Sequence, residues 1–237
     1  MARPDLRRSD EMRKVKLTTD VNAYAAASVL AEVGKTQVLC VATVEKGVPD
    51  FCREKGIGWI RAEYGMLPNA NSKRQARDAE RTRNEQTGEH IGQALRAMTD
   101  LHRLDSVTIT IDCDVLQADG DPIGAASAGA SAALALALQR RQAKGYIRRM
   151  PMQGHLAAMT AAICQEEAVL DPSEKEEAEA QAVFTVWMHE DGEILDLYRS
   201  KSGRPVTREE LKKLISLCKK GTGKLCREQK KITGEWT

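Results

Sequence analysis

The sequence Ile109-Thr110-Ile111-Asp112-Cys113-Asp114-Val115-Leu116-Gln117-Ala118-Asp119-Gly120 passes from a strand-forming run into a polar turn. Residues 107–116 are rich in β-branched side chains, which favour a strand. Residues 125–142 follow as a run of alanines and leucines without a strongly polar face, which predicts a helix buried on several sides. Strand, turn and buried helix in this order indicate an α/β fold.

Other strand and helix patterns flank this stretch on both sides. Residues 26–45 alternate apolar side chains around Gly34-Lys35, which predicts a β-hairpin. A long helix is predicted over residues 72–101, with a highly charged first half. The remaining predictions are strands over 156–170 and 182–188, a hairpin return over 193–198 through Asp191-Gly192, and a helix over 207–219 capped by Thr207 and Glu210. We therefore expect an α/β (α+β) fold.

No Pro/Gly/Ser-rich linker divides the 237 residues, so a single domain over residues 1–237 is expected. The basic, polar tail over residues 219–237 is expected to fray. Lysine and arginine number 36 against 34 acidic residues, and this net charge of +2 neither demands nor excludes a nucleic-acid partner.

Six cysteines lie mostly in apolar runs and lack zinc-site spacing, so reduced, buried thiols are expected. The N-terminus has no apolar core of a signal peptide, and no run of about 18 apolar residues occurs. The expectation is a soluble, cytoplasmic protein with no membrane partner.

Four blocks of the sequence resemble ribonuclease PH and occur in that family's order. They are residues 28–40, residues 59–68, residues 91–96 and residues 109–120. The resemblance implies a fold of two βαβα-type halves. It also implies a phosphorolytic 3′-5′ exoribonuclease that shortens tRNA precursors, and dimers that close into a hexameric ring around an opening for RNA.

The resemblance implies an anion cradle directly after Gly120, made by a Gly-Thr-Arg run and an arginine at the start of the long helix. Here the three positions hold Asp121, Pro122 and Ile123, and the arginine falls at Arg83 when a gap of about four residues is allowed. Asp121 adds a negative charge, Pro122 lacks a backbone donor and Ile123 replaces a guanidinium by hydrocarbon. Phosphate binding is therefore expected to be weak.

The resemblance also implies a pair of aspartates that bind a divalent cation or act as acid and base. An ungapped match places Glu177 at the first position and Val183 at the second, so one carboxylate remains. The acidic run around Glu177 is otherwise expected to be a solvated helix or loop. A new metal site formed by Asp171, Glu174 and Glu177 is the alternative.

Basic residues at the start of the long helix form a candidate RNA surface: Lys73, Arg74, Arg77 and Arg81, with Arg83 beside them. Arg74 and Arg77 match arginines that guide RNA in the family, and Arg53 and Lys55 match a basic loop. Such a surface would bind phosphates without reading bases. The alternative is a helix face whose charges pair with nearby acids.

Two functions remain open. The first is a catalytically degenerate ribonuclease PH-like ring protein that binds RNA, including tRNA, or serves as a scaffold beside copies of itself or an active paralogue. The second is an active phosphate-dependent exoribonuclease acting on tRNA 3′ ends. No cofactor is expected, with phosphate and Mg²⁺ required only for the enzyme.

Overall fold

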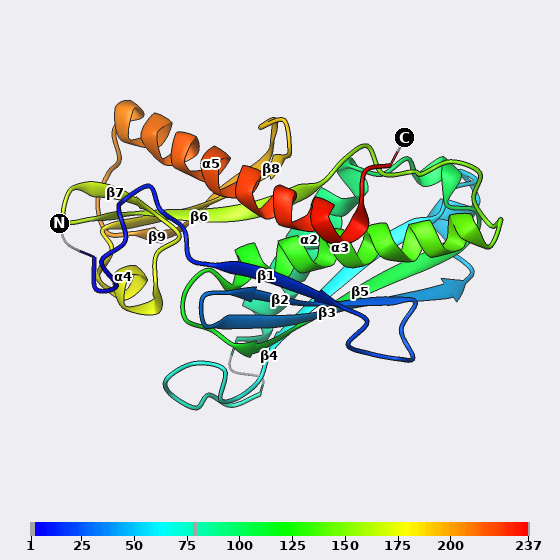
Figure 1. Ribbon diagram of the computed structural model, residues 1–237, viewed down its shortest axis with the longest axis horizontal. Coiled ribbons are helices and arrows are strands. Elements are labelled where there is room, and N and C mark those ends of the chain that lie inside the picture. Colours follow the sequence, from blue (N-terminus) through cyan, green and yellow to red (C-terminus); the bar gives the residue numbers. More distant parts are fainter. Residues whose placement is uncertain (1–2, 78–79, 237) are drawn as a thin grey trace.

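The computed structural model describes residues 3–77 and 80–236, which form two β-sheets with helices between and around them (Figure 1). The first sheet has the strand order β1-β2-β3-β5-β4 and the second β7-β6-β8-β9. The strands are β1 (Val15–Thr19), β2 (Ala27–Val33), β3 (Thr36–Lys46), β4 (Trp59–Met66), β5 (Val107–Gln117), β6 (Leu156–Cys164), β7 (Glu167–Leu170), β8 (Ala182–His189) and β9 (Ile194–Ser202). The helices are α1 (Asp50–Arg53), α2 (Arg81–Ala97), α3 (Pro122–Ala143), α4 (Glu174–Glu179) and α5 (Arg208–Thr233), with a 3₁₀ turn at Leu101–Arg103. The predicted α/β fold is confirmed.

The first half is a mixed sheet. β2 and β3 form the predicted hairpin, with Val33 opposite Thr36. β4 pairs with β5 in parallel, which requires a crossover connection, and α2 supplies it. Gly88 lets α2 lie close to β4, because a Cβ atom there would come within 2.8 Å of the Ala62 carbonyl oxygen.

The helix α3 lies between the two halves, with β2, β3 and β5 on one side and β6 and α5 on the other (Figure 1). Every residue from Gly124 to Ala135 is buried, which confirms the predicted buried helix. By length and composition α3 is apolar enough to cross a membrane, but 78% of its most apolar window is buried inside the protein. It is therefore the central core helix, and buried side chains of both halves meet in one hydrophobic core around it.

The long helix of the first half is shorter than predicted. It begins at Arg81, whereas residues 72–77 and 80 form bends, turns and irregular backbone, and residues 78 and 79 lie outside the described residues. The buried side of α2 starts only at Thr87, so the charged residues before Arg81 have no apolar face to pack. Lys73, Arg74 and Arg77 therefore lie on the connection between β4 and α2.

The C-terminal helix is longer than predicted. The capping box of Thr207 and Glu210 is confirmed, but α5 continues to Thr233. Gln229 is fully buried, and its side-chain amide donates to the carbonyl oxygens of Ala128 at 3.1 Å and Leu156 at 2.9 Å. Fraying from residue 219 is therefore a wrong prediction through residue 233, and residue 237 lies outside the described residues.

Candidate functional site

A pocket of about 180 Å³ opens where the N-terminus of α3 meets α2, α4 and the second sheet. Its lining comprises Tyr64, Met66, Asn71, Glu80, Arg83, Asn84, Thr87, Ala118, Gly120, Asp121, Pro122, Ile123, Thr160, Glu174, Glu177, Val183, Thr185 and Ser200. The structure thus brings the two halves together around the positions predicted for the anion cradle and the acid pair.

Asp121 is the N-cap of α3, and its own carboxylate occupies the helix N-terminus. Its Oδ1 accepts hydrogen bonds from the Gly124 N–H at 2.9 Å and the Thr160 hydroxyl at 2.7 Å, and its Oδ2 accepts one from the Thr160 N–H at 3.1 Å. A helix N-terminus attracts anions through its free N–H groups. Here a carboxylate of the chain already fills that role, and Pro122 has no N–H to offer.

Glu177 places a second carboxylate against the same turn, since its Oε1 accepts a hydrogen bond from the Asp121 N–H at 3.1 Å. Burial, with the nearby charge of Asp171, raises the pKa of Asp121 to about 6. Burial also raises the pKa of Glu177 to about 7, and the charge of Asp121 adds to this effect. Burial thus disfavours the charged form of each carboxyl group, and a phosphate that entered the same space would also lose hydration.

Two further predicted positions line the pocket. Arg83 lies in the first turn of α2, where its side chain is 65% exposed and its Nη1 lies 3.8 Å from an Oε2 of Glu80. Val183, at the position of the second aspartate, contributes a buried hydrocarbon side chain. At the two positions where the resemblance implies an acid pair, the pocket therefore holds one carboxyl group, that of Glu177, and one hydrocarbon side chain, that of Val183.

The acidic run is only partly solvated, contrary to expectation. A capping box of Ser173 and Glu176 starts α4. Glu176 is buried, and its carboxylate accepts two hydrogen bonds from the guanidinium of Arg3, at 2.7 and 2.9 Å. The ion pair with Arg3 thereby holds the Glu176 side chain in the protein interior.

The alternative metal site of Asp171, Glu174 and Glu177 is not assembled. Asp171 is fully buried, and its carboxylate pairs with Arg13 at 2.5 Å and with Arg7 at 3.1 Å. Among the described residues, no three histidine, cysteine or carboxylate side chains come together as metal ligands. Of the three residues of this alternative site, only Glu174 and Glu177 line the pocket.

The predicted RNA-contacting residues fall into two separate groups. Lys73, Arg74 and Arg77 are exposed on the connection after β4, close in sequence to Asn71 at the pocket. Arg81 follows on α2 and pairs with Glu85 at 2.9 Å. The prediction of one face on the long helix is therefore wrong for the first three.

Arg53 and Lys55 form the second group, in and just after α1. They precede β4, whereas the other group follows it, so the length of that strand separates them (Figure 1). Both are exposed, and Arg53 pairs with Asp50 at 3.0 Å.

Comparison with known proteins identifies the family to which this architecture belongs. The profile described as the 3′ exoribonuclease family, domain 1, matches residues 11–138, and the profile of domain 2 matches residues 155–221. The chain belongs to the ribonuclease PH family. The two profiles correspond to the two halves joined across α3.

Solved structures of family members share the fold at low sequence identity. Rrp46 of rice (Oryza sativa) superposes with a TM-score of 0.78 at 14% identity, covering 98% of this chain and all of that one. A chain of the archaeal exosome core gives 0.72 at 19% identity, covering 97% of this chain and 90% of that one. A chain of the Archaeoglobus fulgidus exosome with RNA bound to the active site gives a TM-score of 0.75 at 20% identity, covering 97% of this chain and 91% of that one.

Sequence reasoning missed several residues of this ribonuclease PH-type pocket. Thr160 is the one hydroxyl residue of β6, a strand whose nine residues are all buried. A single hydroxyl residue in an otherwise apolar strand was the signal that the sequence offered. Tyr64 lies in one of the resembling blocks, but a single aromatic residue in a strand pattern does not distinguish a pocket from the core; it lines the pocket, and burial raises its pKa. Arg13 does not line the pocket but binds Asp171 and the Gly120 carbonyl oxygen beside it, and no local pattern in the sequence links these positions.

Replacing Glu177 by glutamine is expected to change how stability depends on pH. The folded protein holds the Glu177 proton up to a pKa of about 7, above the ordinary value of 4.5, so this group's stabilisation is present at low pH and lost as the pH rises through 7. From pH 5 to pH 8, the wild type should lose about 2 kcal/mol of unfolding free energy relative to Glu177→Gln.

Urea unfolding at several pH values measures this difference. Glu179→Gln, which changes an exposed glutamate of the same helix, is the matched control. Parallel pH profiles for wild type and Glu177→Gln would contradict the pKa assignment.

Proposed function

We propose that this chain is a ring-forming, RNA-contacting member of the ribonuclease PH family that does not carry out phosphorolysis itself. The observation that carries the proposal is the filled N-terminus of α3. Asp121 accepts the N–H of Gly124, and Glu177 accepts the N–H of Asp121. The donors that would hold inorganic phosphate are satisfied by carboxylates of the same chain.

The charge of the pocket supports the same conclusion. Four acidic side chains line it, from Glu80, Asp121, Glu174 and Glu177, against the single cation of Arg83. A phosphate entering this space would lose water without gaining a charged donor at position 123, where Ile123 stands. Binding of the attacking anion would therefore be unfavourable.

Ring assembly and RNA contact are supported by the structural neighbours and by the surface. Chains of archaeal exosome cores share the fold, and one of those structures holds RNA at its active site. In this chain the exposed bases Lys73, Arg74 and Arg77 extend from the pocket region. They suit contacts with a phosphodiester backbone, without base reading.

An active phosphorolytic exoribonuclease is the second candidate. It is favoured because Arg83 and Glu177 line the same pocket. The Glu177 carboxyl group, with a pKa of about 7, suits general acid catalysis. This reading requires phosphate, and in the family's chemistry Mg²⁺, to bind despite Asp121.

A phosphate titration separates the two candidates. The full-length protein is incubated with a 3′-extended tRNA at increasing phosphate, and nucleoside diphosphate release is followed by chromatography. We expect no release at any phosphate concentration, while light scattering shows an assembly larger than a dimer.

Release that rises with phosphate, and that is lost in Glu177→Gln, would overturn the proposal and establish the enzyme. A monomer of 26.1 kDa at all concentrations would overturn the ring.

A further inference from the structure

The outer face of α5 carries a concentration of positive charge that the pocket does not explain. The helix contains nine lysines and arginines against three acids, although the whole chain has a net charge of only +2. The exposed basic residues are Arg208, Lys212, Lys213, Lys219, Lys220, Arg227 and Lys231. The helix, with nine bases and three acids, therefore carries a larger net positive charge than the whole chain.

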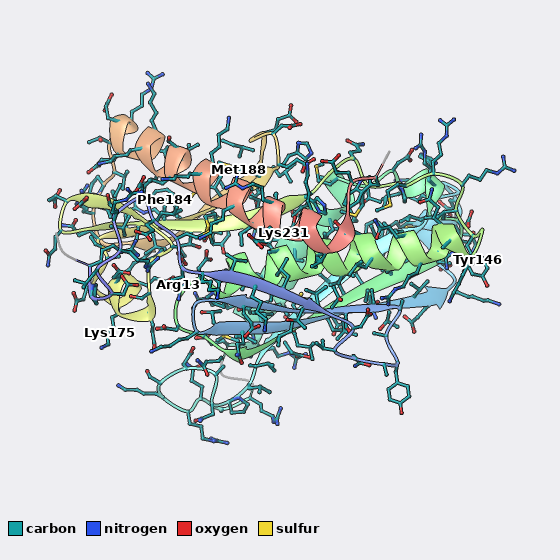
Figure 2. The ribbon with its side chains drawn as sticks, viewed as in Figure 1. Arg13, Tyr146, Lys175, Phe184, Met188 and Lys231 are labelled. Atoms are coloured by element: carbon teal, nitrogen blue, oxygen red, sulfur yellow. The ribbon has the colours of Figure 1, made fainter. Side chains whose placement is uncertain are left out.

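Helical geometry puts most of these bases on one side. Lys213, Lys220, Arg227 and Lys231 recur at intervals of seven and four residues, which places them along one face of a helix. The face opposite is buried against β6, β7 and α3. Figure 2 shows side chains projecting outward along α5, with Lys231 labelled on its C-terminal half.

A groove lies at the middle of this basic face, between α5 and the N-terminal segment. It has a volume of about 450 Å³ and is lined by Arg8, Asp10, Glu11, Met12, Leu170, Lys220, Gly221, Lys224 and Arg227. Lys224 donates to the carbonyl oxygens of Met12 at 3.2 Å and Arg13 at 3.0 Å, which holds the segment in place. Lys220 pairs with Asp10, while Arg227 is exposed beside them.

The groove and the pocket lie on opposite faces of the second sheet. Met159 of β6 points to α5, because a Cβ on Gly221 would come within 2.4 Å of its sulfur. The next residue, Thr160, points to Asp121 with a hydrogen bond of 2.7 Å. Successive strand residues face opposite sides, so a ligand in the groove does not touch the pocket.

We propose that this groove and the basic face of α5 bind the phosphodiester backbone of RNA, at a second site independent of the pocket. A row of ammonium and guanidinium groups matches a chain of phosphates. The helix residues 208–233 include no aromatic side chain, so bases would not be stacked and binding would be insensitive to sequence.

An anionic membrane is a poorer fit for the same charge. Basic helices that bind membranes insert an apolar face between lipids. The apolar residues of α5 are already used inside the protein, since Leu214, Cys218 and Leu225 are fully buried. Nucleic acid requires no such face.

The test is RNA binding by the full-length protein carrying Lys220→Gln and Arg227→Gln, measured by fluorescence anisotropy with two single-stranded RNAs of unrelated sequence. Each phosphate contact to a single strand adds about 0.7 to the slope of log affinity against log salt, so two lost contacts reduce the slope by about 1.4. At about 0.1 M salt this corresponds to roughly 25-fold weaker binding for both RNAs. Lys224 is left in place because it holds the N-terminal segment.

Three controls make the result decisive. Lys46→Gln with Lys144→Gln removes the same charge from exposed positions elsewhere and should leave the slope unchanged. Arg74→Glu with Arg77→Glu removes two bases from the connection before α2 and leaves the groove intact. Comparing this variant with Lys220→Gln/Arg227→Gln shows which of the two surfaces binds RNA. Phosphatidylserine vesicles test the membrane alternative.

An unchanged slope in folded Lys220→Gln/Arg227→Gln protein would overturn the proposal, as would an equal loss in the Lys46/Lys144 control. Binding to vesicles without binding to RNA would overturn it as well.

Discussion

Replacing Asp171 by alanine is expected to lower the free energy of unfolding by about 3–5 kcal/mol, because it leaves a buried guanidinium without its partner. The Arg13 side chain is 8% exposed, and its Nε, Nη2 and backbone N–H all donate to the Asp171 carboxylate. The same guanidinium donates to the carbonyl oxygens of Asp119 and Gly120. Figure 2 places Arg13 where the N-terminal segment enters β1.

Urea unfolding at neutral pH measures this loss, with Asp10→Ala as the control. Asp10 also pairs with a base, Lys220, but its side chain is 40% exposed, so the control should lose much less stability than Asp171→Ala. Equal losses in the two variants would show that burial of the Asp171 pair does not govern its contribution. Because Arg13 holds the turn before α3, we also expect Asp171→Ala to loosen the pocket.

Replacing Asp121 by alanine is expected to cost about 3–4 kcal/mol. Alanine leaves the buried N–H groups of Thr160 and Gly124 without their acceptor, at about 1–3 kcal/mol for each unsatisfied group, whereas the Thr160 hydroxyl keeps the Thr185 hydroxyl as a partner at 2.9 Å. Asp121 also has a φ of 43°, a left-handed conformation that aspartate and asparagine tolerate better than alanine. Asp121→Asn should therefore lose less.

Thr207→Ala supplies the comparison, because Thr207 caps α5 through a hydrogen bond to the Glu210 N–H at a solvent-exposed position. That variant should lose only about 1 kcal/mol, the ordinary value for an N-cap. If Asp121→Ala loses no more than this, the carboxylate is an ordinary cap and its contacts with β6 contribute nothing.

Local patterns in the sequence were enough to predict most of the elements. The β-branched run at residues 107–116, the apolar helix at 125–142 and the capping box at Thr207 each depend on residues a few positions apart. That Asp121, Pro122 and Ile123 stand where the resemblance implies an anion cradle was likewise visible residue by residue. The type of a residue fixes which charges and hydrogen-bond donors it carries, whatever it contacts in the folded protein.

The ends of the helices required tertiary contacts. α2 begins only at Arg81 because the stabilising contacts with β4 start near Thr87 and Gly88. α5 extends past residue 219 because Leu225 and Cys226 are buried beneath its basic face. The helical pattern of residues 72–101 predicted a longer α2, and the basic, polar tail predicted a shorter α5. Neither pattern reports which face of a helix is covered.

The contacts that define the pocket were decided only by the tertiary structure. Asp121 meets Thr160 across 39 residues and Arg13 meets Asp171 across 158. No periodic pattern links positions so far apart, because their approach depends on how the two sheets pack around α3. The sequence by itself determined which residues stand where the resemblance implies an anion cradle, whereas only folding decided that carboxylates of the chain accept the N–H groups of Asp121 and Gly124.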